Sequence, residues 1–113
     1  MKKTLAVVMA VSMLAGCKSL NSIRSKQPID SGVSTKSVNE FASCVSARWD
    51  SGWNSVTSLP LENGISILIP QGMGGYDVVL DVTGKDSGSS YVLYERIPSL
   101  TPASYENNVK ACK

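Results

Sequence analysis

Apolar residues recur every three or four positions just after residue 37, which predicts an amphipathic helix. The stripe comprises Val38, Phe41, Ala42, Val45 and Trp49. Ser37 and Glu40 have the spacing of a capping box, in which the two side chains satisfy free backbone N–H groups of the first turn. Residues 50–52 (Asp-Ser-Gly) are typical of a helix end, so we expect a helix over about 37–50.

The segment that follows shows the alternation of apolar and polar residues that is typical of β-strands. Four strands are expected, over 56–61, 65–69, 76–83 and 90–97. Asn63-Gly64 predicts a tight hairpin between the first two, because both residues tolerate the positive φ of a type I′ turn. The glycine-rich run 71–75 and the segment 84–89 are expected to connect the later strands.

A second helix is predicted at the carboxyl end of the chain. Thr101-Pro102 combines an N-cap hydroxyl with proline at the first helical position. Tyr105, Val109 and Cys112 then fall on one face. The fold class is therefore α+β: a helix, an antiparallel sheet of about four strands, and a helix, with both helices on one sheet face. We expect the other face to be solvated, with Asp77, Asp81, Tyr94 and Arg96 on it.

The first sixteen residues have the pattern of an export signal. Lys2 and Lys3 precede an apolar run over 5–15. This run is about half of the roughly 20 residues that a membrane-spanning helix requires. Leu14-Ala15-Gly16-Cys17 follows it directly and resembles the lipobox of bacterial lipoproteins. The alternative is an ordinary secretory signal with an unrelated cysteine.

The resemblance to a lipobox implies a lipid anchor on Cys17. In that family the thiol receives diacylglycerol, the preceding peptide bond is cut, and the new amine is acylated. Three acyl chains give stable membrane attachment. Asp after the cysteine retains such proteins in the inner membrane, whereas Lys18 stands here, which favours the periplasmic face of the outer membrane. The expected organisation is a signal peptide (1–16), a lipid-anchored flexible tether (17–36) and a small domain (37–113).

The charge of the processed chain does not suggest a nucleic-acid-binding surface. Loss of Lys2 and Lys3 with the signal leaves nine basic and nine acidic residues, so the processed chain is formally neutral. A nucleic-acid-binding domain instead concentrates Lys and Arg on one surface. We therefore expect no nucleic-acid partner.

Two cysteines, Cys44 and Cys112, remain when Cys17 carries lipid. The compartment beyond the inner membrane is oxidising, so we expect them to form a disulfide. It would close a loop of about 69 residues and stabilise the domain by roughly 4 kcal/mol. The alternative is a pair of free thiols used in redox or metal chemistry, although neither cysteine belongs to a C-x-x-C motif.

Residues able to perform catalysis are scarce in this chain. It has no histidine, no G-x-S-x-G motif and no S-x-x-K motif after the signal. The glycine run 71–75 lacks the lysine and the following helix of a phosphate-binding loop. Asp77 and Asp81 are too far apart on one strand face to share a proton. We expect no enzymatic activity, no cofactor and no metal site.

The sequence thus predicts an anchored envelope lipoprotein whose domain binds or occludes a protein partner without catalysis. Trp53 and Met73 are candidate partner contacts, since one follows a glycine at the helix end and the other lies in the glycine run. The order of elements and the paired cysteines resemble small lipoproteins of Gram-negative bacteria, which implies no particular activity. Two alternatives are a phage or plasmid exclusion or toxin-immunity lipoprotein, and a structural accessory of an envelope complex.

Overall fold

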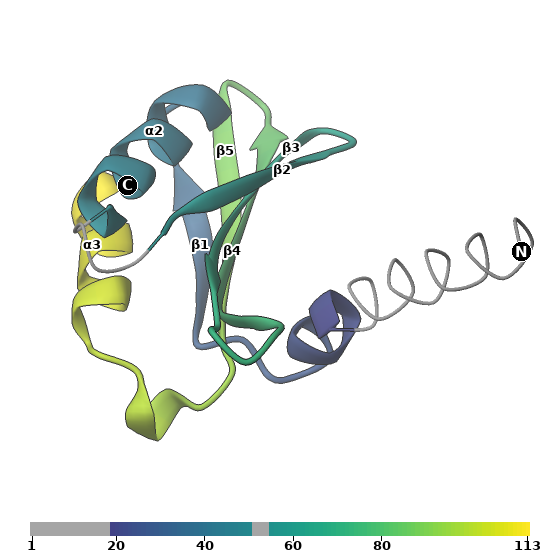
Figure 1. Cartoon of the computed structure of the whole chain (residues 1–113). Helices are drawn as coiled ribbons and strands as arrows, with labels where there is room; N and C mark the ends of the chain where they lie inside the picture. Colours follow the sequence, from purple (N-terminus) through teal and green to yellow (C-terminus); the bar gives the residue numbers. More distant parts are fainter. Residues whose placement is uncertain (1–18, 51–54) are drawn as a thin grey trace, which may run out of the picture.

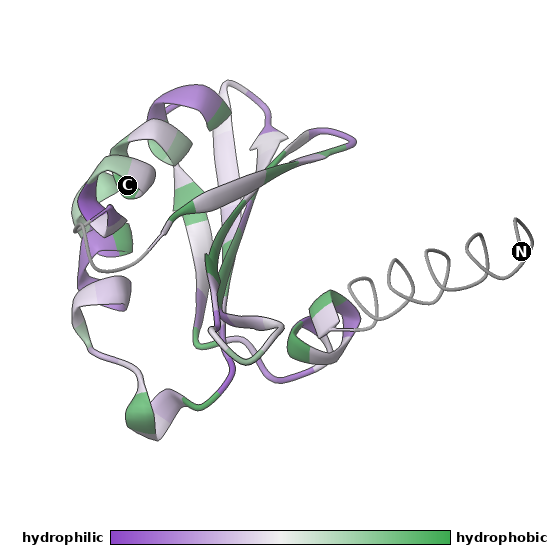
Figure 2. Cartoon of the chain, viewed as in Figure 1, coloured by the Kyte–Doolittle hydropathy of each residue, from purple (hydrophilic) through white to green (hydrophobic). Residues whose placement is uncertain are grey.

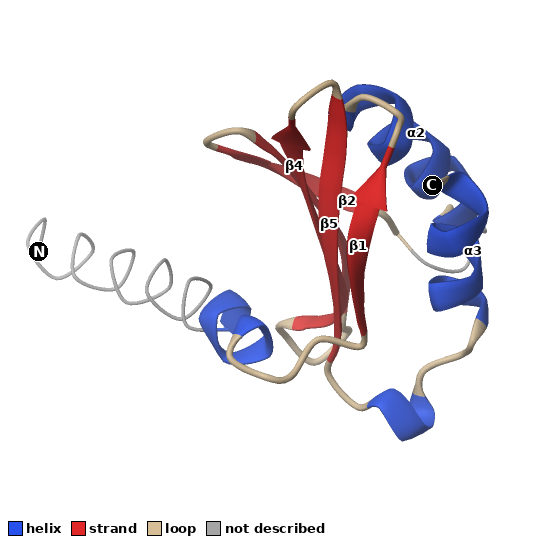
Figure 3. Cartoon of the chain, turned by 180° about the vertical axis from the view of Figure 1, so that it is seen from behind, coloured by secondary structure: helices blue, strands red, loops and turns tan. Residues whose placement is uncertain are grey.

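A five-stranded antiparallel sheet with two helices on one face forms the domain (Figures 1 and 3). The computed structural model describes residues 19–50 and 55–113. In spatial order the strands are β1 (Asp30–Ser34), β5 (Gly88–Glu95), β4 (Tyr76–Lys85), β3 (Gly64–Pro70) and β2 (Thr57–Leu61). The two helices on that face are α2 (Val38–Trp49) and α3 (Ser104–Cys112), and a short 3₁₀ turn, η1 (Pro98–Leu100), precedes α3. The predicted α+β class and helix–sheet–helix order are confirmed.

Helix α2 forms where the apolar stripe predicts it. Ser37 is the N-cap, and its side chain accepts a hydrogen bond from the Glu40 amide at 3.2 Å. The last turn closes when the Asp50 amide donates to the Ser46 carbonyl. The buried residues of the helix are Phe41, Ala42, Val45 and Trp49, four of the five that make up the predicted stripe.

The main core lies between the sheet and the two helices. Apolar side chains of the three central strands meet those of α2 and α3 there, and Figure 2 shows hydrophobic residues along the central strands. The fully buried residues of this layer include Phe41, Val45, Ile67, Val78, Leu80, Val82, Leu93, Val109 and Cys112. The ring of Phe41 stacks on that of Tyr91, with 5.4 Å between ring centroids.

Strand β1 lies in the region that the sequence predicts as a flexible tether, and that prediction is wrong. Its five residues pair antiparallel with β5, from Asp30 opposite Leu93 to Ser34 opposite Ser89. The segment carries one exposed valine, Val33, and no apolar alternation. Hydrogen bonding to the free edge of β5 holds it instead, and such pairing leaves no hydrophobic pattern in the sequence.

The hairpin between β2 and β3 turns one residue earlier than predicted. Leu61 pairs with Gly64, so residues 62 and 63 form the turn and Gly64 begins β3. Asp86 is the single described residue other than glycine with positive φ, so the expected type I′ geometry at Asn63-Gly64 is wrong. Gly64 is required for a different reason: a Cβ there would lie 1.9 Å from the carbonyl oxygen of Val82.

The last helix begins later than its predicted N-cap. Thr101 donates its hydroxyl to the Ile97 carbonyl at 2.8 Å and so closes the turn that contains η1. Helix α3 starts at Ser104, and Ala103 before it makes no side-chain capping bond. A hydroxyl that finds a nearer carbonyl partner does not cap the helix, which explains why the prediction at Thr101-Pro102 is wrong.

Candidate functional site

The N-terminal segment, which we define as residues 19–26, covers part of the sheet face opposite α2 and α3 (Figures 1 and 3). Residues 19–24 are helical, and Ile23 is buried against Leu68 and Val79. The side chains around this second core are Leu20, Tyr76 and Tyr94. The outer face is therefore partly covered rather than fully solvated, which corrects the prediction for Asp81 and Tyr94.

Arg24 attaches the N-terminal segment to the centre of this face. Its Nε and Nη2 donate to the two carboxylate oxygens of Asp81 at 2.9 and 3.0 Å, and Nη2 also donates to Ser66 Oγ at 2.8 Å. Ser66 donates its own proton to Asp81. Burial, followed by the charge of Asp81, raises the pKa of Tyr94, and the charge of Arg24 opposes this shift. Ser66 is fully buried, so the network is structural and does not present a nucleophile.

A second set of contacts joins the N-terminal segment to the end of β5. Lys26 donates from Nζ to the carbonyl of Arg96. Arg96 in turn donates from Nε to Asp77 Oδ1 at 3.1 Å, and the Arg96 amide donates to the Asp77 carbonyl at 2.9 Å. The side chains of Arg96 and Asp77 are 37% and 42% exposed, so this pair meets the expectation of a solvated polar surface.

The glycine loop, residues 71–75, lies beside the N-terminal segment. Gly74 and Gly75 have φ of 107° and 78°, values that favour glycine because it lacks a Cβ. The Gln71 amide donates to the Gly75 carbonyl at 3.0 Å and the Gly74 amide donates to the Gln71 carbonyl at 3.1 Å. The loop leads directly into β4, as expected for a strand connection.

Met73 projects from the tip of this closed loop and is 93% exposed. The side chain of Gln71 stabilises the loop when its amide is oriented so that both its oxygen and its nitrogen form hydrogen bonds. Its oxygen then accepts from Arg96 Nη2 at 2.8 Å, and its nitrogen donates to the Gly74 carbonyl at 3.0 Å. The predicted contact residue Met73 is thus presented by a hydrogen-bonded loop.

Between the glycine loop and the N-terminal segment lies a cavity of about 480 Å³, which we call the N-terminal groove. A Cβ at Gly75 would lie 3.7 Å from Ser19 Cβ, so the loop and the segment are in van der Waals contact range. The lining is largely apolar and includes two basic residues. It comprises Ser19, Ser22, Ile23, Lys26, Gly74, Gly75, Tyr76 and Arg96.

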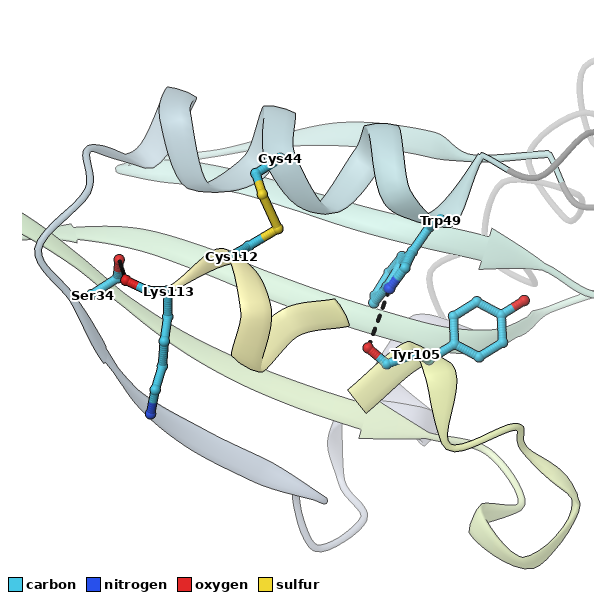
Figure 4. Close-up of a disulfide and its surroundings, with 6 residues drawn as sticks. All are labelled: Ser34, Cys44, Trp49, Tyr105, Cys112 and Lys113. Atoms are coloured by element: carbon cyan, nitrogen blue, oxygen red, sulfur yellow. Dashed lines mark hydrogen bonds between the residues drawn. A yellow bond between two sulfur atoms is a disulfide. The ribbon is translucent and has the colours of Figure 1, made fainter. Parts of the chain in front are cut away.

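On the opposite face, Cys44 of α2 and Cys112 of α3 form the expected disulfide (Figure 4). Their Cα atoms are 5.7 Å apart, within the usual range for this bond. Trp49 Nε1 donates to the Tyr105 carbonyl at 3.3 Å, and Ser34 donates its hydroxyl to the Lys113 carbonyl at 3.1 Å (Figure 4). These contacts join the two helices and fasten β1 to the carboxyl end of the chain.

The remaining predicted positions are distributed over the molecule. Cys17 and Trp53 lie outside the described residues. Tyr91 and Tyr94 lie on opposite sheet faces, as the alternation predicts. Burial, a hydrogen bond from its hydroxyl to Asp30 and nearby acidic charges raise the pKa of Tyr91 to about 12.

Sequence reasoning missed the N-terminal segment as part of the site. Its available indications were the apolar pair Leu20 and Ile23, three positions apart, and the arginine after them. Because serines and an asparagine surround these two apolar residues, the segment has the composition of a polar linker. The partners that stabilise it are 42 and 57 residues further along the chain.

Within residues 19–50 and 55–113, no group of three His, Cys, Asp or Glu side chains is arranged to hold a metal ion. No helix in the same two ranges is long and apolar enough to cross a membrane. Comparison of the chain with protein-family models, with curated proteins and with solved structures gave no match.

Proposed function

We propose that this protein is a lipid-anchored lipoprotein of the bacterial envelope whose domain binds or occludes a partner without catalysis. The observation that carries the proposal is the sequence Leu14-Ala15-Gly16-Cys17 after a short apolar run. The disulfide between Cys44 and Cys112 supports it, because such bonds persist in oxidising compartments outside the cytoplasm.

The non-enzymatic part of the proposal is supported by the chemistry that the side chains offer. The chain has no histidine to act as a general base. The sulfurs of Cys44 and Cys112 are bonded to each other, and the hydroxyl of Ser66 is buried between Arg24 and Asp81. Binding is a better match for the surface, where the N-terminal groove offers a largely apolar lining.

Lipid attachment is tested by intact mass spectrometry of the full chain purified from the envelope of a Gram-negative host. We expect loss of residues 1–16 and addition of diacylglycerol and one further acyl chain at Cys17. Cys17→Ser should retain the signal and gain no lipid, whereas the matched variant Cys44→Ser should still be lipidated. Cleavage at another position, or an unmodified Cys17 at the mature end, would refute the anchor.

Membrane location is tested separately by fractionation of the envelope. Wild-type protein should sediment with the outer membrane because Lys18 follows the lipidated cysteine, and Lys18→Asp should move it to the inner membrane. Crosslinking and affinity purification of the lipidated protein from these membranes then test the binding role. Turnover of a peptidoglycan, ester or phosphate substrate that one substitution abolishes would contradict the non-enzymatic proposal.

A further inference from the structure

The folded domain begins immediately after the proposed lipid site. Ser19 lines the N-terminal groove and lies beside Gly75 of the glycine loop. Consecutive Cα atoms are about 3.8 Å apart, so the Cα of Cys17 lies within about 7.6 Å of the Cα of Ser19 in any conformation of the chain. The glycine loop is therefore held close to the residue that would carry the acyl chains.

This short connection leaves no room for a spacer between the membrane and the domain. Ile23 is 3% exposed and Arg24 donates two hydrogen bonds to Asp81, so the N-terminal segment is part of the domain rather than a tether. A lipid on Cys17 would place the bilayer surface against whatever surrounds Ser19. Gly75 of the glycine loop lies beside Ser19.

The loop has the chemistry of a membrane contact. Met73 is the most exposed of the large hydrophobic side chains among the described residues, and the loop's internal hydrogen bonds hold it at the tip. An unbranched thioether side chain adapts readily to an irregular apolar environment. Residues 71–75 contain no acidic residue that would repel a phospholipid surface.

The charge near the anchor complements anionic lipid. Residues 18–29 contain Lys18, Arg24 and Lys26 and no acidic residue. Arg24 is paired with Asp81, whereas Lys26 is exposed and donates to a neutral carbonyl, so its charge stays available at the surface. A lysine side chain near an anionic membrane surface is attracted to that surface.

We infer that the glycine loop, through Met73 and together with Lys26, rests on the phospholipid surface and seats the domain directly on the membrane. This inference rests on the proposed lipidation of Cys17. From Tyr76 to Lys85, β4 extends away from the loop for about 30 Å at roughly 3.3 Å per residue. The β4–β5 turn is therefore presented away from the lipid, where a protein partner can reach it.

A photo-crosslinking amino acid tests this seating in the lipidated full-length protein. It is placed at position 73 or, as the matched control, at Val33, and each protein is reconstituted into vesicles of phosphatidylethanolamine and phosphatidylglycerol. Val33 is also an exposed apolar residue, but it pairs with Ser90, which pairs with Thr83, seven residues along β4 from Tyr76, the first residue after the loop. This separation is about 23 Å.

After irradiation, the peptide that contains position 73 should carry the mass of one phospholipid several-fold more often than the peptide that contains position 33. A flexible Gly-Ser spacer of about 12 residues, inserted between Lys18 and Ser19, would separate the domain from the anchor by roughly 20 Å. It should lower the adduct at position 73 several-fold without changing lipidation. Equal labelling at both positions, or no effect of the spacer, would overturn the seating while Cys17 remained lipidated. An unlipidated Cys17 in the intact mass would instead overturn the proposed function and the seating together.

Discussion

Arg24 donates two hydrogen bonds to the carboxylate of Asp81, which lies 57 residues further along the chain. The pair stands on the sheet face opposite the helices, and the two side chains are 27% and 17% exposed. Bidentate bonding of this kind fixes geometry as well as charge. The contact makes the residues just after the proposed lipid site part of the folded domain.

Replacing Arg24 should destabilise the domain. Arg24→Ala leaves the carboxylate of Asp81 partly buried without its cation, which should lower the free energy of unfolding by about 1–3 kcal/mol. Urea denaturation followed by circular dichroism measures this change. Lys26→Ala is the matched control, since Lys26 is exposed, and it should cost less than about 0.5 kcal/mol. Equal stability of the two variants would contradict a structural role for the Arg24–Asp81 pair.

The disulfide predicts a non-additive pattern of stability. Cys44→Ala and Cys112→Ala should each lower the free energy of unfolding by about 2–5 kcal/mol, because either change removes the same covalent constraint on the unfolded chain. The free energy of unfolding of the double variant should be no lower than that of the less stable single variant. A reducing agent should lower the melting temperature of the wild type and leave both single variants unchanged. Two titratable thiols in the exported protein would rule the bond out.

The glycine loop allows a matched comparison between two of its glycines. Gly75 has φ of 78°, a backbone conformation that residues with a Cβ rarely adopt, so Gly75→Ala should destabilise the protein by about 1 kcal/mol. Gly72 has open space around its Cα, and Gly72→Ala should be neutral or slightly stabilising. Differential scanning calorimetry of the two variants measures the difference. A larger loss from Gly72→Ala would show that the loop has another conformation.

Glu95 should make stability depend on pH. It is 6% exposed on the helix-covered face, and burial, followed by the charge of Glu106, raises its pKa above the ordinary value. The native state therefore holds this proton more tightly than the unfolded state does. The stabilisation is full below the unfolded pKa, near pH 4, and is lost as the pH rises through the native value.

Glu95→Gln should consequently raise the melting temperature at pH 7 and have little effect below about pH 4, where wild-type Glu95 is already neutral. Thermal denaturation across this pH range measures the effect. Glu62→Gln in the exposed β2–β3 turn is the control and should not reproduce the pH-dependent gain. A constant difference between Glu95→Gln and wild type at every pH would contradict the assignment.

Elements with a long local pattern could be predicted from the sequence. The stripe from Val38 to Trp49 makes a helix because apolar spacing, cap and stop agree within fourteen residues. The alternation along β4 and β5 likewise specifies which side chains face the helices. The disulfide followed from the number of cysteines and the expected compartment, and the tertiary structure brings Cys44 and Cys112 together.

Only the tertiary structure determined the secondary structure of residues 19–36. Strand β1 exists because β5 offers an unpaired edge, and backbone hydrogen bonds to that edge need no particular side chain. The helical turn around Ile23 exists because Leu68, Val79 and Asp81, more than forty residues away in sequence, form the surface that it covers. A short segment has too few local interactions to offset its loss of conformational entropy. Its structure therefore depends on distant partners that no local pattern in the sequence reveals.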